Sequence, residues 1–183
     1  AASLLTINGG IFETGVDMIR TAGSAAGNVR LINNRMSGFS AYGAPVVVAL
    51  DGTGSPTALT WGSGSFSVGT LALNSVNANN TVDFRNPIAL GNSPRAVNVN
   101  AGSGYPATMS GVLSSSGGSG GLTKGGPGTL ILTGTNTFAG QLIVNAGTLS
   151  VGTVNNTSAD GPLGNSTNSV SIAGGATFEY SGA

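Results

Sequence analysis

The 183-residue chain has no cysteine and no histidine, and charged residues make up only 7% of it. An ordinary soluble domain is about 25% charged, so this surface must consist mainly of small, uncharged side chains. The six basic residues are scattered among six acidic ones, which leaves no basic patch of the kind that nucleic-acid phosphates require. A lack of cysteine is compatible with export, because a free thiol outside the cell is a liability, although many intracellular proteins lack it too.

Long apolar segments are also missing. The longest uninterrupted apolar run spans residues 46–50, whereas a membrane-spanning helix needs about 20 apolar residues, so we expect no membrane insertion of this segment. Hydrophobic residues still make up 39% of the chain and recur in short, regular runs, which argues against disorder. Residues 1–6 lack the basic region of an intact signal peptide, and the chain stops within a strand-like pattern. We therefore expect a segment of a longer protein.

What the chain does have is a series of short apolar runs that alternate with period two, each bounded by Gly, Asn, Ser or Thr. Such alternation predicts β-strands with one buried face. Residues 13–25 alone have a mildly helical spacing; Gly15 and Gly23 limit it, so a short helix or a capping turn is the minority alternative there. Residues 122–151 supply four strands, and the others are predicted at 4–7, 29–32, 46–50, 59–61, 66–68, 71–73, 81–84, 88–90, 96–99, 108–113, 169–172 and 177–180.

Three all-β layouts accommodate this pattern: a sandwich, a closed barrel or a β-solenoid. The solenoid is favoured because the strands are shorter than the ~5–6 residues typical of sheets, and because the hairpin dipeptide Asn-Gly occurs only at Asn8-Gly9. The tripeptide Gly-Thr-Leu also recurs, at 128–130 and 147–149. That offset is close to the ~20 residues of one coil in short-repeat solenoids, and it predicts roughly eight or nine coils.

We expect residues 1–183 to form one β-helix domain in which each coil is stabilised by its neighbours. The Ser/Gly-rich residues 114–121 resemble a flexible linker in isolation, but directly before a strand repeat we expect them to form a corner of one coil. The two end coils expose unpaired strand edges, which favours self-association through the ends.

Residues 122–151 resemble the autotransporter-associated β-strand repeat, also called the passenger-associated transport repeat. Its general run is Leu-x-Lys-x-Gly-x-Gly-Thr-Leu-x-Leu-x-Gly-x-Asn-Thr-aromatic-x-Gly, followed by an extended stretch that ends in Ala-Gly-Thr-Leu. Pro127, between two of the glycines, and Gln141-Leu142 depart from the usual pattern. The repeat positions that we single out are Lys124, Gly128, Thr129, Leu130, Gly134, Asn136, Phe138, Gly140, Gly147, Thr148 and Leu149.

The resemblance implies a single-stranded right-handed parallel β-helix in a large exported or cell-surface bacterial protein. In that family the repeat is associated with efficient secretion of the passenger rather than with chemistry.

Candidate catalytic residues are few. β-Helix enzymes that act on polysaccharides need clustered carboxylates, and the acids here lie far apart in the sequence, so we predict no catalytic site, no cofactor and no metal. The turn at 51–54 lacks the further acids of a repeated calcium-binding motif, and the glycine runs lack the Lys-Ser/Thr of a phosphate loop. The acids are Glu13, Asp17, Asp51, Asp83, Asp160 and Glu179.

Exposed aromatic side chains are the remaining candidates for binding. Tyr42 and Tyr105 are flanked by Gly or Pro in predicted turns and could stack on sugar rings, whereas Trp61 and Phe66 are expected inside the coils. Three functions follow: a structural scaffold, stalk or self-associating filament subunit; an adhesin or glycan-binding module; and a carbohydrate-active enzyme, for which the necessary residues are missing. The partners that we expect are other copies of the chain, other surface proteins or a cell-surface glycan.

Overall fold

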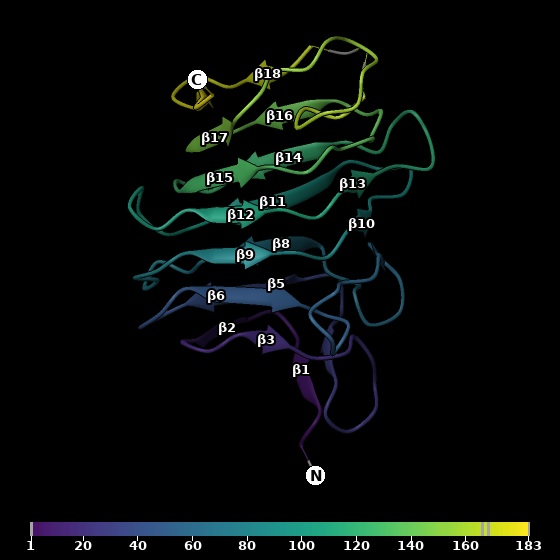
Figure 1. Ribbon diagram of the computed structural model, residues 1–183, viewed down its shortest axis with the longest axis vertical. Helices are drawn as coiled ribbons and strands as arrows, with labels where there is room; N and C mark the ends of the chain where they lie inside the picture. The colour runs from purple at the N-terminus through teal and green to yellow at the C-terminus, as the bar shows by residue number, and fades with distance from the viewer. Residues whose placement is uncertain (1, 166, 168, 183) are drawn as a thin grey trace.

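Each short strand has one apolar face to bury, and the chain buries these faces by winding into stacked coils. The computed structural model describes residues 2–165, 167 and 169–182, and its strands stack in parallel along one rod (Figure 1). The chain climbs from the N-terminus at one end of the rod to the C-terminus at the other (Figure 1). The predicted all-β parallel solenoid is confirmed.

Two seven-stranded parallel sheets form the long faces of the rod. The first long sheet consists of β2 (Ile11–Thr14), β5 (Met36–Ala41), β8 (Thr70–Leu73), β11 (Arg95–Val99), β14 (Leu122–Gly125), β16 (Leu142–Val144) and β18 (Ser171–Ile172). The second long sheet consists of β3 (Met18–Ile19), β6 (Val46–Ala49), β9 (Val82–Phe84), β12 (Ala107–Met109), β15 (Thr129–Leu132), β17 (Thr148–Val151) and β19 (Thr177–Tyr180).

A shorter third face closes each coil. It contains a three-stranded sheet of β7 (Leu59–Thr60), β10 (Ile88–Ala89) and β13 (Leu113–Ser114), and a separate pair formed by β1 (Leu5–Ile7) and β4 (Val29–Leu31). One turn of the rod passes through all three faces. For example, β11, β12 and β13 follow one another before β14 returns to the first long sheet and pairs with β11.

The number of coils differs from the prediction. Seven strands in each long sheet correspond to about six turns, so eight or nine coils was wrong. The 19-residue spacing holds only where Thr129 pairs with Thr148, whereas Val46 pairs with Val82, which is 36 residues later. The loops between the strands vary in length from coil to coil. A single short offset therefore overestimated the number of coils.

The helix considered as an alternative at residues 13–25 does not occur; these residues hold the end of β2, all of β3 and turns. The strand expected at 66–68 is wrong, and isolated bridges from Phe66 to Leu31 and Ser63 replace it. The prediction also missed β2, β3 and β5. The sequence of β5, Met-Ser-Gly-Phe-Ser-Ala, is rich in small polar residues. A β-carbon at Gly38 would lie 1.7 Å from the Ala72 carbonyl oxygen. The close approach of β8 therefore excludes any larger residue at this position of β5.

The inward side chains form one continuous apolar core along the rod. The Phe84 ring lies between those of Phe39 and Phe66, with centroid distances of 6.4 and 6.2 Å, and Trp61 meets Phe66 edge-on at 5.4 Å. The buried Trp61 indole donates its N–H to the Val68 carbonyl at 2.8 Å. The predicted burial of Trp61 and Phe66 is thus confirmed.

Candidate functional site

The repeat at 122–151 forms strands β14, β15, β16 and β17, a coil and a half of the rod. Its two Gly-Thr-Leu tripeptides lie one above the other, because Thr129 pairs with Thr148 and Leu130 pairs with Leu149. Gly147 has a φ of +64°, and a β-carbon there would lie 2.5 Å from the carbonyl oxygen of Gly128. The repeated glycine therefore lets two short corners stack in close contact.

Lys124 is fully buried inside this repeat. It follows Leu122 by two residues on a strand, so the strand alternation directs it inward. Its Nζ donates hydrogen bonds to three carbonyl oxygens, those of Gly125 (2.9 Å), Gly126 (2.8 Å) and Ala146 (2.9 Å). Burial lowers the pKa of Lys124 from 10.5 to about 8, since a low-dielectric site disfavours the charged form. The lysine ties the corner after β14 to the corner above it.

Asn136 is the buried polar residue that joins neighbouring coils on the third face of the repeat. Its side-chain oxygen accepts the Leu113 N–H at 2.8 Å, and its amide nitrogen donates to the Pro162 carbonyl at 2.9 Å. Two coils earlier, Asn86 bonds the Leu50 N–H and the Thr57 carbonyl, which both lie in one loop of the preceding coil. These side chains pair backbone groups that the turn would otherwise bury without partners.

The other repeat residues surround these two polar side chains. Phe138 is fully buried and fills the coil where it passes through the third face. Gly134 and Gly140 are buried on either side of it, and each lies against the backbone of the preceding coil. Most of the repeat positions singled out in the sequence thus lie in the core or at tight corners. Thr129 and Thr148 are half-buried on strands β15 and β17, and Gly147 lines an open recess at the corner before β17.

Tyr42 and Tyr105 lie on the same edge of the rod, where each coil passes from the first long sheet to the second. We call the first four loops of this edge the tyrosine corner. It is formed by residues 15–17, 42–45, 74–81 and 100–106. The two tyrosines are two coils apart, with 53% and 40% of their surfaces exposed. Both rings are therefore partly covered and partly open to solvent.

The six acids do not gather in one place. Three of them accept hydrogen bonds from serines of neighbouring coils: Glu13 from Ser40 (2.8 Å) and Ser75 (2.7 Å), Asp83 from Ser110 (2.6 Å) and Glu179 from Ser150 (2.8 Å). These carboxylates act as links between coils. Among the residues that the structure describes, no three acids lie close enough to hold a metal ion.

Two acids lie where the sequence placed them. Asp83 pairs with Arg85, its neighbour two residues on, with Oδ2 and Nε 2.8 Å apart, as expected for same-face residues on a strand. Asp51 is engaged within its own turn, where it accepts hydrogen bonds from the Thr53 N–H and hydroxyl and from the Gly54 N–H. These bonds, led by the Thr53 hydroxyl, lower the pKa of the Asp51 carboxyl. A plain turn accounts for this geometry.

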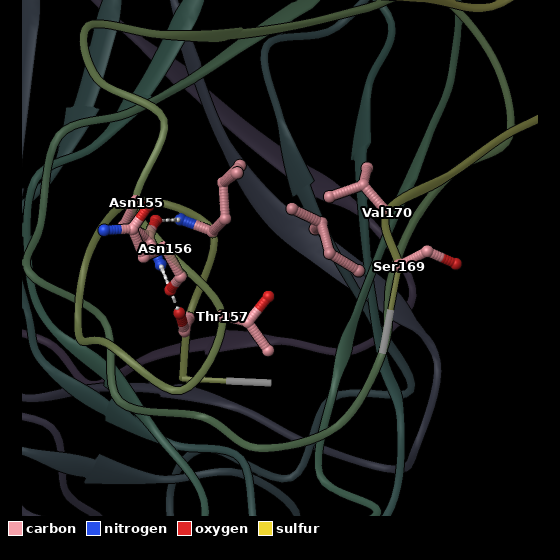
Figure 2. A pocket seen from close by; sticks show the side chains of 8 residues that line it. Asn155, Asn156, Thr157, Ser169 and Val170 are labelled. Carbon is pink, nitrogen blue, oxygen red and sulfur yellow. Dashed lines mark hydrogen bonds between the residues drawn. The ribbon is translucent and has the colours of Figure 1, made fainter. Parts of the chain in front are cut away.

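A small recess of about 170 Å³ opens beside the third face near the C-terminal end. Figure 2 shows Asn156 and Thr157 on one side of it and Ser169 and Val170 on the other. Asn155 turns to its own loop, where its side chain bonds the backbone of residues 159, 163 and 164. Because the amide of Asn155 is already engaged in its own loop, we assign no site to this recess.

The family comparison bears directly on the repeat. Residues 122–151 match the passenger-associated transport repeat. The resemblance read from the sequence is therefore confirmed, with the same bounds. The structure shows why the pattern recurs: its glycines and its asparagine form tight corners, its lysine joins two coils, and its leucines fill the core.

A second comparison extends the similarity beyond the repeat. The chain is 42% identical, over 97 residues, to a protein named adhesin BmaC autotransporter from Brucella suis biovar 1 (strain 1330). The match covers 53% of this chain and only 2% of that protein, so the chain spans a small part of its relative. No solved structure matches the chain. None of the described residues belongs to a helix that is long and apolar enough to cross a membrane.

Proposed function

We propose that this chain is a stiff, non-catalytic scaffold segment of an exported bacterial surface protein. The observation that carries the proposal is the continuous core that runs through every coil. A solenoid with one unbroken core resists bending, because each coil contacts its neighbours along the rod on all three faces. The transport repeat and the autotransporter relative support a location outside the cell.

The surface fits a scaffold better than an enzyme. The described acids are dispersed and several bond to serines of neighbouring coils, whereas polysaccharide hydrolysis needs two carboxylates facing the same glycosidic bond. Incubating the chain with a panel of polysaccharides should therefore release no sugar. Turnover that is lost on substituting Asp83 or Asp160 would favour the carbohydrate-active alternative.

The scaffold role can be tested by removing one coil. Deletion of residues 129–147 joins Gly128 to Thr148, and places the second Gly-Thr-Leu where the first one lay. We expect the protein that carries this segment to remain folded and displayed at the cell surface, with its rod shorter by about 4.8 Å.

A deletion shorter by one residue, 129–146, is the matched control. It puts Thr148 in the inward position of Leu130 and turns Leu149 outward, since strand alternation has a period of two. We expect this variant to unfold locally and to reduce surface display, measured by protease accessibility in intact cells. Equal display of the two deletions would contradict a role that depends on coil stacking.

Adhesion is the second candidate function. It is favoured by the name of the relative, an adhesin, and by the exposed tyrosines that share one edge of the rod. A stiff rod and a binding edge are compatible, because the residues that build the core and those that face solvent alternate along the same strands.

A further inference from the structure

Exposed apolar side chains gather on the tyrosine corner, one on each of the first four coils. The exposed fractions are 72% for Val16, 53% for Tyr42, 76% for Val76 and 40% for Tyr105. They occupy successive loops on the edge where β5, β8 and β11 pass to β6, β9 and β12, at the left of Figure 1. Four of the ten large apolar side chains exposed among the described residues thus lie along this edge. Grouped exposure of this kind marks interaction surfaces.

One buried side chain holds this edge in place. Asn74 is fully buried, and its Oδ1 accepts the N–H of Ala41, the residue before Tyr42, at 2.9 Å. Its Nδ2 donates to the carbonyl of Asn80 at 2.9 Å and to that of Tyr105 at 3.0 Å. A single amide therefore fixes the backbone of three successive loops. A surface fixed in this way loses little conformational entropy when a ligand binds.

The loops of the tyrosine corner contain amides, hydroxyls and glycine but no lysine or arginine, and Asp17 is their one charged residue. Asp17 is already engaged, because its Oδ1 accepts the Val47 N–H at 2.8 Å. Asn77 is exposed beside Val76 and its amide makes no hydrogen bond to another described residue. The edge therefore combines flat aromatic faces and the free amide of Asn77 with no basic side chain. Its two carboxylates, Asp17 and the neighbouring Glu13 that bonds Ser75, already accept hydrogen bonds, which suits an uncharged ligand that is rich in hydroxyls.

The narrow shape of the tyrosine corner also favours a glycan over a protein as its partner. A stable protein interface buries about 800 Å² on each side, whereas this edge presents one exposed large apolar side chain on each of its four loops. An extended sugar chain needs only a narrow track. Because neighbouring coils are about 4.8 Å apart, the loops of Tyr42 and Tyr105 are about 10 Å apart along the rod, which allows both rings to contact separate sugar units of one chain.

We propose that the tyrosine corner binds an uncharged, extended glycan that lies along the rod axis. Tyr42 and Tyr105 stack on the C–H faces of the sugar rings, Asn77 bonds their hydroxyls, and Asn74 is the positioning residue beneath them. The inference supplies a ligand class for the second candidate function and does not depend on the scaffold role.

The test uses the 183-residue chain and three linear hexasaccharides: β-1,4-linked glucose, β-1,4-linked N-acetylglucosamine and a sulfated hexasaccharide. Saturation-transfer NMR and calorimetry should detect binding of at least one neutral sugar and weaker binding of the sulfated one. Replacing both tyrosines, Tyr42→Ala with Tyr105→Ala, should weaken binding about tenfold or more. Tyr42→Phe with Tyr105→Phe should retain most of it, since the ring faces remain.

Tyr180→Ala is the matched control, because Tyr180 is 55% exposed but lies on β19 near the C-terminal end of the rod. It should leave binding unchanged, and the fluorescence of the single, buried Trp61 reports that every variant is folded. The proposal is overturned if neither neutral sugar binds, if the sulfated sugar binds more tightly, or if Tyr180→Ala weakens binding as much as the double substitution. None of these outcomes would alter the coil-deletion result, so failure of glycan binding and failure of the scaffold role are distinguishable.

Discussion

Replacing the buried Lys124 with methionine tests how the transport repeat holds its corner. The ammonium group has no solvent exposure, and its pKa falls from 10.5 to about 8. Since each factor of ten in proton affinity is worth about 1.4 kcal/mol, this difference corresponds to about 3 kcal/mol between the protonation states. The three carbonyl bonds favour the charged form and oppose the effect of burial, so that figure is an upper bound.

The direction of the pH dependence follows from linkage. Between pH 8 and 10.5 the folded chain releases the Lys124 proton while the unfolded chain retains it, so the unfolded state binds more protons and stability rises with pH. Below pH 8 both states are protonated, and Lys124 adds no further pH dependence. We expect the contribution of Lys124 to the free energy of unfolding to increase by at most about 2 kcal/mol from pH 8 to pH 10.

Urea unfolding at pH 7, 8, 9 and 10, followed by Trp61 fluorescence, measures this increase. Lys124→Met should abolish the rise, because methionine has a similar shape and no titratable group. At pH 7 the variant should lose only about 1–2 kcal/mol, since the desolvation cost of the charge disappears while the three carbonyls lose their donor. Gly126 and Ala146 line an open recess at the corner, which lets water reach their oxygens. Identical pH dependence in the two proteins would refute the reasoning.

The remaining predictions concern corners and ends. Gly147→Ala should lower the free energy of unfolding by about 2–3 kcal/mol, because alanine is strained at a φ of +64°. Gly174 has open space around it, so Gly174→Ala should change that free energy by less than about 0.5 kcal/mol. Denaturant titration of both variants measures the difference. Asn136→Ala should cost about 2–4 kcal/mol by leaving two buried backbone groups unpaired, while Asn145→Ala at an exposed corner should be nearly neutral in the same titration. The unpaired outer edges of β18 and β19 should make the chain associate end to end, and sedimentation that shows a strict monomer over a wide concentration range would contradict this.

The sequence predicted the class of fold because two local signals agree. Period-two alternation defined most strands, and the repeated Gly-Thr-Leu marked strands that stack, as the pairing of Leu130 with Leu149 confirms. Strand prediction failed where a strand lacks this apolar alternation. The small residues of β5 carry no apolar alternation, and their strand forms because β2 and β8 pair with it from both sides. The number of coils was wrong for a similar reason, since loop length is free to vary wherever a corner faces solvent.

For the candidate site, too, the sequence predicted local features and the tertiary structure decided which residues meet. The sequence alone determined that Tyr42 and Tyr105 lie in turns. Only the tertiary structure decided that the two tyrosines share an edge, because stacking of coils brings residues 63 positions apart onto loops that are two coils apart on the same edge. Only the structure showed that Asn74 joins those loops, since a hydrogen bond between coils has no fixed spacing along the chain. Local chemistry specified strands and corners, and the pairing between coils decided which side chains meet.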